Sequence, residues 1–198
     1  MTSQRIGIYS GTFDPVHAGH MTFALQALEQ AKLDKIYFLP ERRPRHKPGV
    51  EHYAHRLTML QQATVPYEQF YVLESVEISF TVKRTLPLLL QKFKGAQLVF
   101  LFGSDAVAEL PSWPLANRLL TASELVIAAR QGDDTQQLQA AIAAWRVQPQ
   151  AAVMITSYAP AVSSTSVREA LRARQPVAGL LQSVARYSDH HWLYVSVA

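Results

Sequence analysis

Short apolar segments alternate along the chain with longer segments of helical character. Six of the apolar segments are nearly continuous, a pattern typical of strands that are buried on both faces. They cover residues 6–9, 36–39, 70–73, 98–102, 125–129 and 153–155. Predicted helices lie between them, over residues 21–30, 52–64, 82–93, 114–121 and 135–145. This alternation predicts an α/β fold, with a Rossmann-like, doubly wound, mainly parallel sheet and helices on both of its faces.

Composition agrees with one globular domain. The chain has 198 residues, of which 48% are hydrophobic and 17% charged. It contains no internal repeat or low-complexity linker, so we expect a single domain over residues 1–198. No apolar run approaches the roughly 18 residues that span a bilayer, and the first apolar run is too short for a signal peptide. We therefore expect a cytoplasmic protein with no membrane partner.

Charge and cysteine content narrow the chemistry further. The absence of cysteine excludes a disulfide framework and a thiolate metal site. A formal charge of +4 suits a small polyanionic substrate, but a solvated basic surface gives the same value. One basic cluster between Arg42 and Lys47 is too little to indicate nucleic-acid binding.

A glycine-bearing turn, Ser-Gly-Thr-Phe-Asp-Pro-Val-His-Ala-Gly-His, joins the first predicted strand to the first predicted helix. Gly11, Pro15 and Gly19 make this connection tight and leave its backbone exposed. The free N–H groups and the dipole of a helix N-terminus favour a bound anion. His17 and His20 are three residues apart at the start of the helix, so both rings can face one bound group.

This turn resembles the signature of the nucleotidylyltransferase superfamily, Gly-x-Phe-x-Pro-x-His-x-Gly-His. All six defining residues stand at the required spacing, and neither the Walker pattern nor Gly-x-Gly-x-x-Gly is present there. With Thr12 and Asp14, the turn is most similar to that of the bacterial nicotinate mononucleotide adenylyltransferases. The resemblance implies that ATP is contacted by Gly11, Thr12, Phe13, His17, Gly19 and His20.

A basic loop follows the second predicted strand and reads Pro-Glu-Arg-Arg-Pro-Arg-His-Lys-Pro over residues 40–48. Its prolines exclude a helix, and its cations gather at the carboxyl end of a strand, where α/β folds bind ligands. A solvated basic loop is the alternative. The family has Pro-Pro-His-Lys here, with Arg45 replacing the second proline in this chain, so the resemblance implies acceptor binding by His46 and Lys47. The resemblance also matches Arg56 to a family arginine and implies that Arg56 binds the acceptor. Taken alone, Arg56 is typical of a surface residue on a helix.

Residues 79–86 resemble a family segment that borders the acceptor pocket, with one difference in spacing. The family has Ser-Tyr-Thr, two residues and then Thr-Leu, whereas three residues separate the two parts here. The resemblance implies acceptor contacts from Thr81 and Thr85, and the changed spacing leaves the identity of the acceptor open. A helix N-cap at Ser79 or Thr81 is the alternative interpretation.

Further candidate residues follow the fourth and fifth predicted strands. Gly103 lets the backbone approach a ligand closely, and Asp105 can accept hydrogen bonds from a ribose or cap the next helix. Trp113 can pack in the core or stack on a ring at the ligand edge. The family has Gly-x-Asp, a pyridine-stacking tryptophan and an arginine at these places. The resemblance therefore implies ATP contacts from Gly103, Asp105 and Arg130 and an acceptor contact from Trp113.

Two serines and a threonine before Val167 are typical of a helix N-terminus. Arg168 lies one turn from Ser164, so both can face one site, although an ordinary helix cap has the same pattern. The family has Ile-Ser-Ser-Thr-x-x-Arg here, which binds the ATP triphosphate. Residues 177–194 are also similar to the closing helix and strand of the family. The resemblance implies triphosphate binding by Ser163, Ser164, Thr165 and Arg168.

The resemblance implies an enzyme that transfers AMP from ATP to nicotinate mononucleotide, giving deamido-NAD and pyrophosphate. The acceptor phosphate would attack the α-phosphorus in line, so the protein's tasks are positioning and charge neutralisation. Protonated His17 and His20, together with Lys47 and Arg168, would be the catalytic residues. Mg²⁺ would be bound through substrate phosphates and water, without a protein metal ligand.

Other functions fit the same residues. A related adenylyltransferase would use nicotinamide mononucleotide, pantetheine phosphate or a sugar phosphate as acceptor. A non-catalytic nucleotide sensor would keep the pocket and lack turnover. Small-molecule substrates are the expected partners, with a homo-oligomer as an open option. In each case two helix starts from opposite ends of the chain must meet around one phosphate chain.

Overall fold

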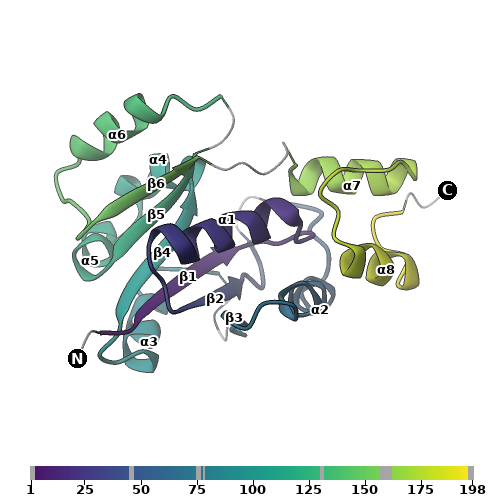
Figure 1. The fold of residues 1–198 in the computed structure, drawn as a ribbon, viewed down its shortest axis with the longest axis horizontal. Coiled ribbons are helices and arrows are strands. Elements are labelled where there is room, and N and C mark those ends of the chain that lie inside the picture. The colour runs from purple at the N-terminus through teal and green to yellow at the C-terminus, as the bar shows by residue number, and fades with distance from the viewer. Residues whose placement is uncertain are drawn as a thin grey trace.

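A computed structural model describes residues 3–44, 47–74, 77, 79–129, 132–156 and 162–195 (Figure 1). Its centre is one six-stranded sheet. The strands are β1 (Arg5–Gly11), β2 (Lys35–Pro40), β3 (Phe70–Val72), β4 (Gln97–Gly103), β5 (Glu124–Ala129) and β6 (Ala152–Thr156). All neighbouring strands are parallel, in the order β3-β2-β1-β4-β5-β6. The predicted strands and the doubly wound parallel sheet are confirmed.

Helices connect these strands and follow the last one. They are α1 (Ala18–Gln30), α2 (Tyr53–Thr64), α3 (Thr85–Lys92), α4 (Ser104–Glu109), the 3₁₀ turn η1 (Leu110–Ser112), α5 (Ala116–Ala122), α6 (Thr135–Ala143), α7 (Ser164–Ala173) and α8 (Gln182–His190). None of the helices that the structure describes is long and apolar enough to cross a membrane. The sequence did not predict α4 and η1, because each is shorter than two helical turns and has no measurable periodicity.

Two predicted elements differ in detail. The helix expected over residues 82–93 begins only at Thr85. The backbone N–H of Arg84 donates to the hydroxyl of Thr81 at 3.2 Å, which closes a separate turn before the helix. The strand expected near the end of residues 177–194 is not found, because the described residues there form α8 and turns.

Alternate side chains of each central strand enter two separate cores. On one face, Val99 and Leu101 of β4 pack in a core that includes Phe23 of α1 and Met59 of α2. On the other face, Phe100 of the same strand belongs to a core built with α3, α4, α5 and α6. Figure 1 shows α1 lying across the sheet, with α7 and α8 beyond one end of it. Burial on both faces explains why the strands have continuous apolar sequences.

The strand order places a switch point between β1 and β4. The chain builds β2 and β3 on one side of β1 and β4 to β6 on the other. Open α/β sheets bind ligands at such a point, outside the carboxyl ends of the strands. The loop after β1 and Gly103 at the end of β4 both lie at this edge.

Candidate functional site

The loop that joins β1 to α1, hereafter the β1–α1 loop, contains a strained residue. Phe13 has a φ of 49°, in the left-handed region that bulky side chains rarely adopt. Its buried ring packs against Tyr9, His20 and Phe38, with centroids 5.3, 5.1 and 5.8 Å away. Tight packing of this kind holds a backbone in an unfavourable conformation, and such conformations gather at functional sites.

Arg56 of α2 supports this loop from behind. Its side chain is 1% exposed, and its guanidinium donates to four backbone carbonyls. The acceptors are Glu51 at 2.8 Å, Thr12 at 2.6 Å, Glu41 at 2.9 Å and Arg42 at 3.1 Å. The residue therefore ties the β1–α1 loop to the loop after β2. Arg56 is not on the surface, and it does not line the cavity between the β1–α1 loop and the start of α7. This geometry favours a supporting role over the expected acceptor contact.

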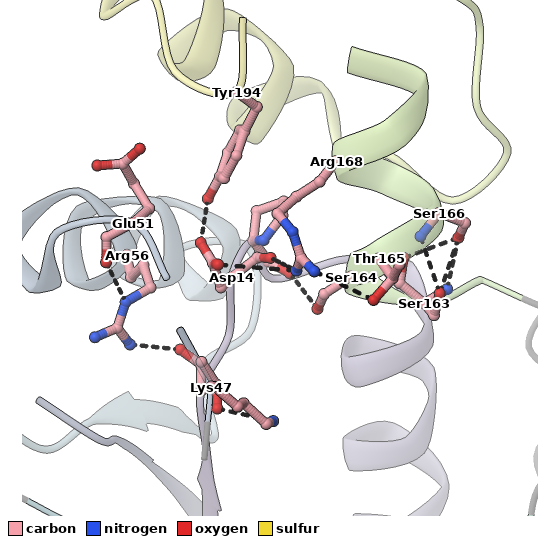
Figure 2. A network of polar contacts seen from close by, with 12 residues as sticks. Asp14, Lys47, Glu51, Arg56, Ser163, Ser164, Thr165, Ser166, Arg168 and Tyr194 are labelled. Atoms are coloured by element: carbon pink, nitrogen blue, oxygen red, sulfur yellow. Dashed lines mark hydrogen bonds and ion pairs between the residues drawn. The ribbon is translucent and has the colours of Figure 1, made fainter. Parts of the chain in front are cut away.

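The start of α7 is fastened to the other side of the β1–α1 loop (Figure 2). The hydroxyl of Ser164 donates to the carbonyl of Pro15 at 3.0 Å, and Arg168 Nη1 donates to the carbonyl of Asp14 at 2.7 Å. Ser163 caps α7 through its hydroxyl. The structure thus brings together the two helix starts, those of α1 and α7, that the sequence placed at opposite ends of the chain.

The two histidines at the start of α1 form a close pair. Their ring centroids are 3.8 Å apart. The backbone N–H of His17 donates to Nδ1 of His20 at 3.2 Å, so this nitrogen is unprotonated and the neutral ring carries its proton on Nε2. Nδ1 of His17 is buried and has no hydrogen-bond partner in the part of the chain that the structure describes.

Burial disfavours the charged form of both histidines. It lowers the pKa of His17 to about 4. The pKa of His20 lies well below its usual value, first because of burial and then because of the neighbouring His17 and Lys47. Without a ligand both rings are therefore neutral near pH 7, in contrast to the protonated forms expected with a bound phosphate. A neutral His20 still offers its Nε2–H to an anion.

A cavity of about 920 Å³ opens between these elements, which is within the usual range for a small-molecule site. Its walls come from the β1–α1 loop, the start of α1, residues 47–50, the ends of β4 and β5, and the start of α7. The predicted residues that line it are Thr12, His17, Gly19, His20, Lys47, Gly103, Ser163, Ser164, Thr165 and Arg168. Nearly all of the expected phosphate-binding residues thus share one cavity.

Lysine and arginine side chains make this cavity attractive to an anion. Lys47 Nζ donates to the hydroxyl of Thr12 at 3.1 Å, which brings a cation from the loop after β2 to the β1–α1 loop (Figure 2). Arg168 also donates to the hydroxyl of Thr165 at 3.2 Å. These two cations and the N-termini of α1 and α7 all favour negative charge in the same space.

Other predicted residues lie outside the lining of this cavity. Gly11 ends β1, Phe13 packs beneath the loop, and Asp105 lies in the first turn of α4. His46 and Arg130 fall outside the described residues, so their predicted contacts have no structural counterpart here.

The expected acceptor residues form a separate group. Trp113 packs edge-on against Phe102 with ring centroids 5.7 Å apart. The Thr81 N–H donates to the hydroxyl of Thr85 at 3.0 Å. The N-cap position of α3 is Arg84, with no side-chain cap, so neither Ser79 nor Thr81 is the helix N-cap that the alternative interpretation expected. None of Thr81, Thr85 and Trp113 lines the cavity, so the described geometry does not bring them to the phosphate-binding residues.

The sequence analysis missed two residues that help to build the site. Asp14 is 3% exposed, and its carboxylate accepts a hydrogen bond of 2.7 Å from Tyr194 near the C-terminus. Val162 packs against the backbone of both Gly19 and Gly179. The Tyr194 contact joins the C-terminal part of the chain to the β1–α1 loop, and the Val162 contacts join it to the start of α1.

Comparisons with known proteins agree with this geometry. The chain matches the family described as cytidylyltransferase-like over residues 8–170. The nicotinate-nucleotide adenylyltransferase of Bacillus subtilis is 32% identical over 201 residues, covering 98% of this chain and 100% of that protein. The "probable nicotinate-nucleotide adenylyltransferase" of Neisseria meningitidis is 32% identical over 201 residues, covering 96% of this chain and 98% of that protein.

Solved structures share the fold as well. The Plasmodium falciparum nicotinic acid mononucleotide adenylyltransferase complexed with APC has a TM-score of 0.77 and 15% sequence identity to this chain. The match covers 96% of this chain and 97% of that one. The family match, the near full-length relatives and the shared cavity lead to one conclusion. The chain belongs to the cytidylyltransferase-like family and, within it, to the nicotinate-nucleotide adenylyltransferases.

Proposed function

We propose that this protein transfers AMP from ATP to nicotinate mononucleotide, giving deamido-NAD and pyrophosphate. One observation supports this most: the starts of α1 and α7 open onto a single cavity that also holds His17, His20, Lys47 and Arg168. The names of the near full-length relatives support the same reaction.

The reaction needs little activation of the nucleophile. A phosphate monoester is already an anion near neutral pH. An oxygen of the acceptor phosphate would form a bond to the α-phosphorus of ATP while the bond from that phosphorus to the β-phosphate oxygen breaks, releasing pyrophosphate. The protein would then contribute by aligning the two phosphates and stabilising charge on the transferring group.

The residues of the cavity suit these tasks. Nε2–H of His20 would donate to a phosphate oxygen, since its Nδ1 is engaged by the His17 N–H. Lys47 would neutralise charge from the side of the loop after β2, and Arg168 from the side of α7. Ser164 and Thr165 at the start of α7 would help to hold the leaving pyrophosphate, as helix N-termini commonly do.

Magnesium would be held mainly by the substrates. Among the described residues, no group of three histidine, aspartate or glutamate side chains is arranged as a metal site. Asp14, which lines the cavity, already accepts a hydrogen bond from Tyr194. This donor set fits Mg²⁺ bound through phosphate oxygens and water. When bound, the ion would neutralise part of the triphosphate charge.

A panel of acceptors tests this function directly. Purified protein, ATP and Mg²⁺ would be mixed with nicotinate mononucleotide, nicotinamide mononucleotide, pantetheine phosphate or a sugar phosphate, and pyrophosphate release would be measured. We expect the highest kcat/KM with nicotinate mononucleotide. Preference for another acceptor would replace the proposed substrate, and binding of ATP without turnover on any acceptor would indicate a nucleotide sensor.

A further inference from the structure

The end of the chain returns to the candidate site. Tyr194 is 8% exposed, and its hydroxyl donates to Asp14 Oδ1 at 2.7 Å across 180 residues of sequence. Figure 2 shows the tyrosine reaching from beyond α8 toward the β1–α1 loop. Burial and the neighbouring Asp14 raise the pKa of Tyr194, so the hydroxyl keeps its proton and remains a donor.

Asp14 connects this tyrosine to Arg168. The buried carboxylate has Oδ1 bonded to Tyr194, and Oδ2 lies 3.8 Å from Arg168 Nη1. The same nitrogen donates to the backbone carbonyl of Asp14 at 2.7 Å. A carboxylate that is 3% exposed needs such partners, because an unpaired buried charge is strongly unfavourable. The guanidinium of Arg168 thus lies against both the carboxylate and the backbone carbonyl of Asp14.

We propose that Tyr194 is a positioning residue for AMP transfer: by holding the Asp14 carboxylate, it aims Arg168 at the phosphate chain of ATP. This inference rests on the proposed function. Tyr194 itself does not line the cavity, whereas Asp14 and Arg168 do. Substitution of Tyr194 should therefore affect the steps that depend on ATP and pyrophosphate. The KM of the acceptor should change little.

Removal of one hydroxyl tests the inference. Tyr194→Phe is expected to lower kcat/KM for ATP by about tenfold, the effect of losing one hydrogen bond to a charged group. The matched control is Tyr187→Phe on α8, whose hydroxyl lies 3.0 Å from His55 Nδ1, away from the cavity. Unchanged ATP kinetics in folded Tyr194→Phe would overturn the inference.

A double-mutant cycle separates positioning from general loosening of the structure. In an Arg168→Ala background, Tyr194→Phe should have little further effect on kcat/KM for ATP, because the group it positions is gone. A loss of equal size in both backgrounds would show that Tyr194 does not act through Arg168. If Tyr194→Phe fails to fold, Asp14→Asn replaces it, since this change keeps the side-chain shape and removes the charge. Wild-type ATP kinetics in Asp14→Asn would equally overturn the inference.

Failure of the proposed function would give a different result. In that case the wild-type protein would release no pyrophosphate with any acceptor. Calorimetric binding of ATP and of pyrophosphate would then be compared between Tyr194→Phe and Tyr187→Phe. Weaker binding by Tyr194→Phe alone would support the positioning role, and equal binding by the two variants would contradict it.

Discussion

His20 is the residue whose chemistry the structure defines most closely. The backbone N–H of His17 occupies its Nδ1, and burial keeps the ring neutral, so Nε2–H is left as a fixed donor. Sequence spacing indicated that both histidines could face one group. It could not indicate their tautomer or charge, because these depend on burial and on a backbone contact within the folded loop.

Substitution of His20 tests this donor role. We expect His20→Ala to lower turnover at least about 100-fold, or roughly 2.7 kcal/mol of transition-state stabilisation, while the circular dichroism spectrum stays unchanged. His190→Ala, at an exposed position of α8, serves as the control and should retain full turnover. Near-normal turnover of folded His20→Ala would contradict the catalytic role.

His17 makes stability dependent on pH. Its folded pKa of about 4 lies below the ordinary value of 6.5, so the unfolded chain binds more protons between these two values. The contribution of the neutral His17 to the free energy of unfolding is therefore complete above about pH 6.5 and is lost as the pH falls toward about 4. We predict that the thermal unfolding midpoint decreases over this window, and by less in His17→Gln. Equal decreases in both proteins would mean that His17 does not titrate as described.

At the scale of elements, α2 connects two loops through one buried side chain. Arg56 shares the buried face of α2 with Met59, Leu60 and Ala63, at the spacing of an amphipathic helix. That spacing was the available signal that the arginine is buried. Its four carbonyl partners could not be predicted, since they come from loops whose paths are set only by the whole fold.

Arg56→Lys tests this supporting role. A lysine cannot reach all four carbonyls, so we expect the free energy of unfolding to fall by about 3 kcal/mol, measured by urea denaturation. Arg118→Lys, at an exposed position of α5, should change it little. A rise in acceptor KM with unchanged stability would instead favour the direct acceptor contact implied by the family resemblance.

The segment between α7 and α8 packs on the start of α1 through a glycine. Gly179 has a φ of 84° and its carbonyl accepts from the Ala18 N–H at 2.8 Å. A Cβ at this position would lie 3.0 Å from Val162. We expect Gly179→Ala to destabilise the protein by about 2 kcal/mol, from the left-handed backbone and this contact together.

Gly95 provides a matched control for this prediction. It has a φ of 83°, but a Cβ added there would meet open space, so Gly95→Ala should include only the backbone effect. Urea denaturation should therefore show a larger decrease in the free energy of unfolding for Gly179→Ala than for Gly95→Ala. Adding Val162→Ala to Gly179→Ala should restore part of that decrease. Equal losses at the two glycines would show that the contact with Val162 is not tight.

At the scale of the whole molecule, the sheet was predictable because its strands are buried on both faces. Their apolar runs contrast sharply with the connecting segments, and the sequence predicted all six of them. The short α4 has too few residues to show a periodic pattern, and α3 begins after a turn that Thr81 closes, which apolar patterns do not report. The meeting of α1 and α7 followed from family motifs, whereas the contact between Tyr194 and Asp14 left no local pattern, because 180 residues separate the partners.

The most direct measurement is a crystal structure of the protein with a non-hydrolysable ATP analogue. It should show phosphate oxygens of one analogue within hydrogen-bond distance of both His20 Nε2 and the Arg168 guanidinium, inside the cavity that these side chains line. Phosphates held by only one of the two helix starts, or bound outside this cavity, would contradict the shared site.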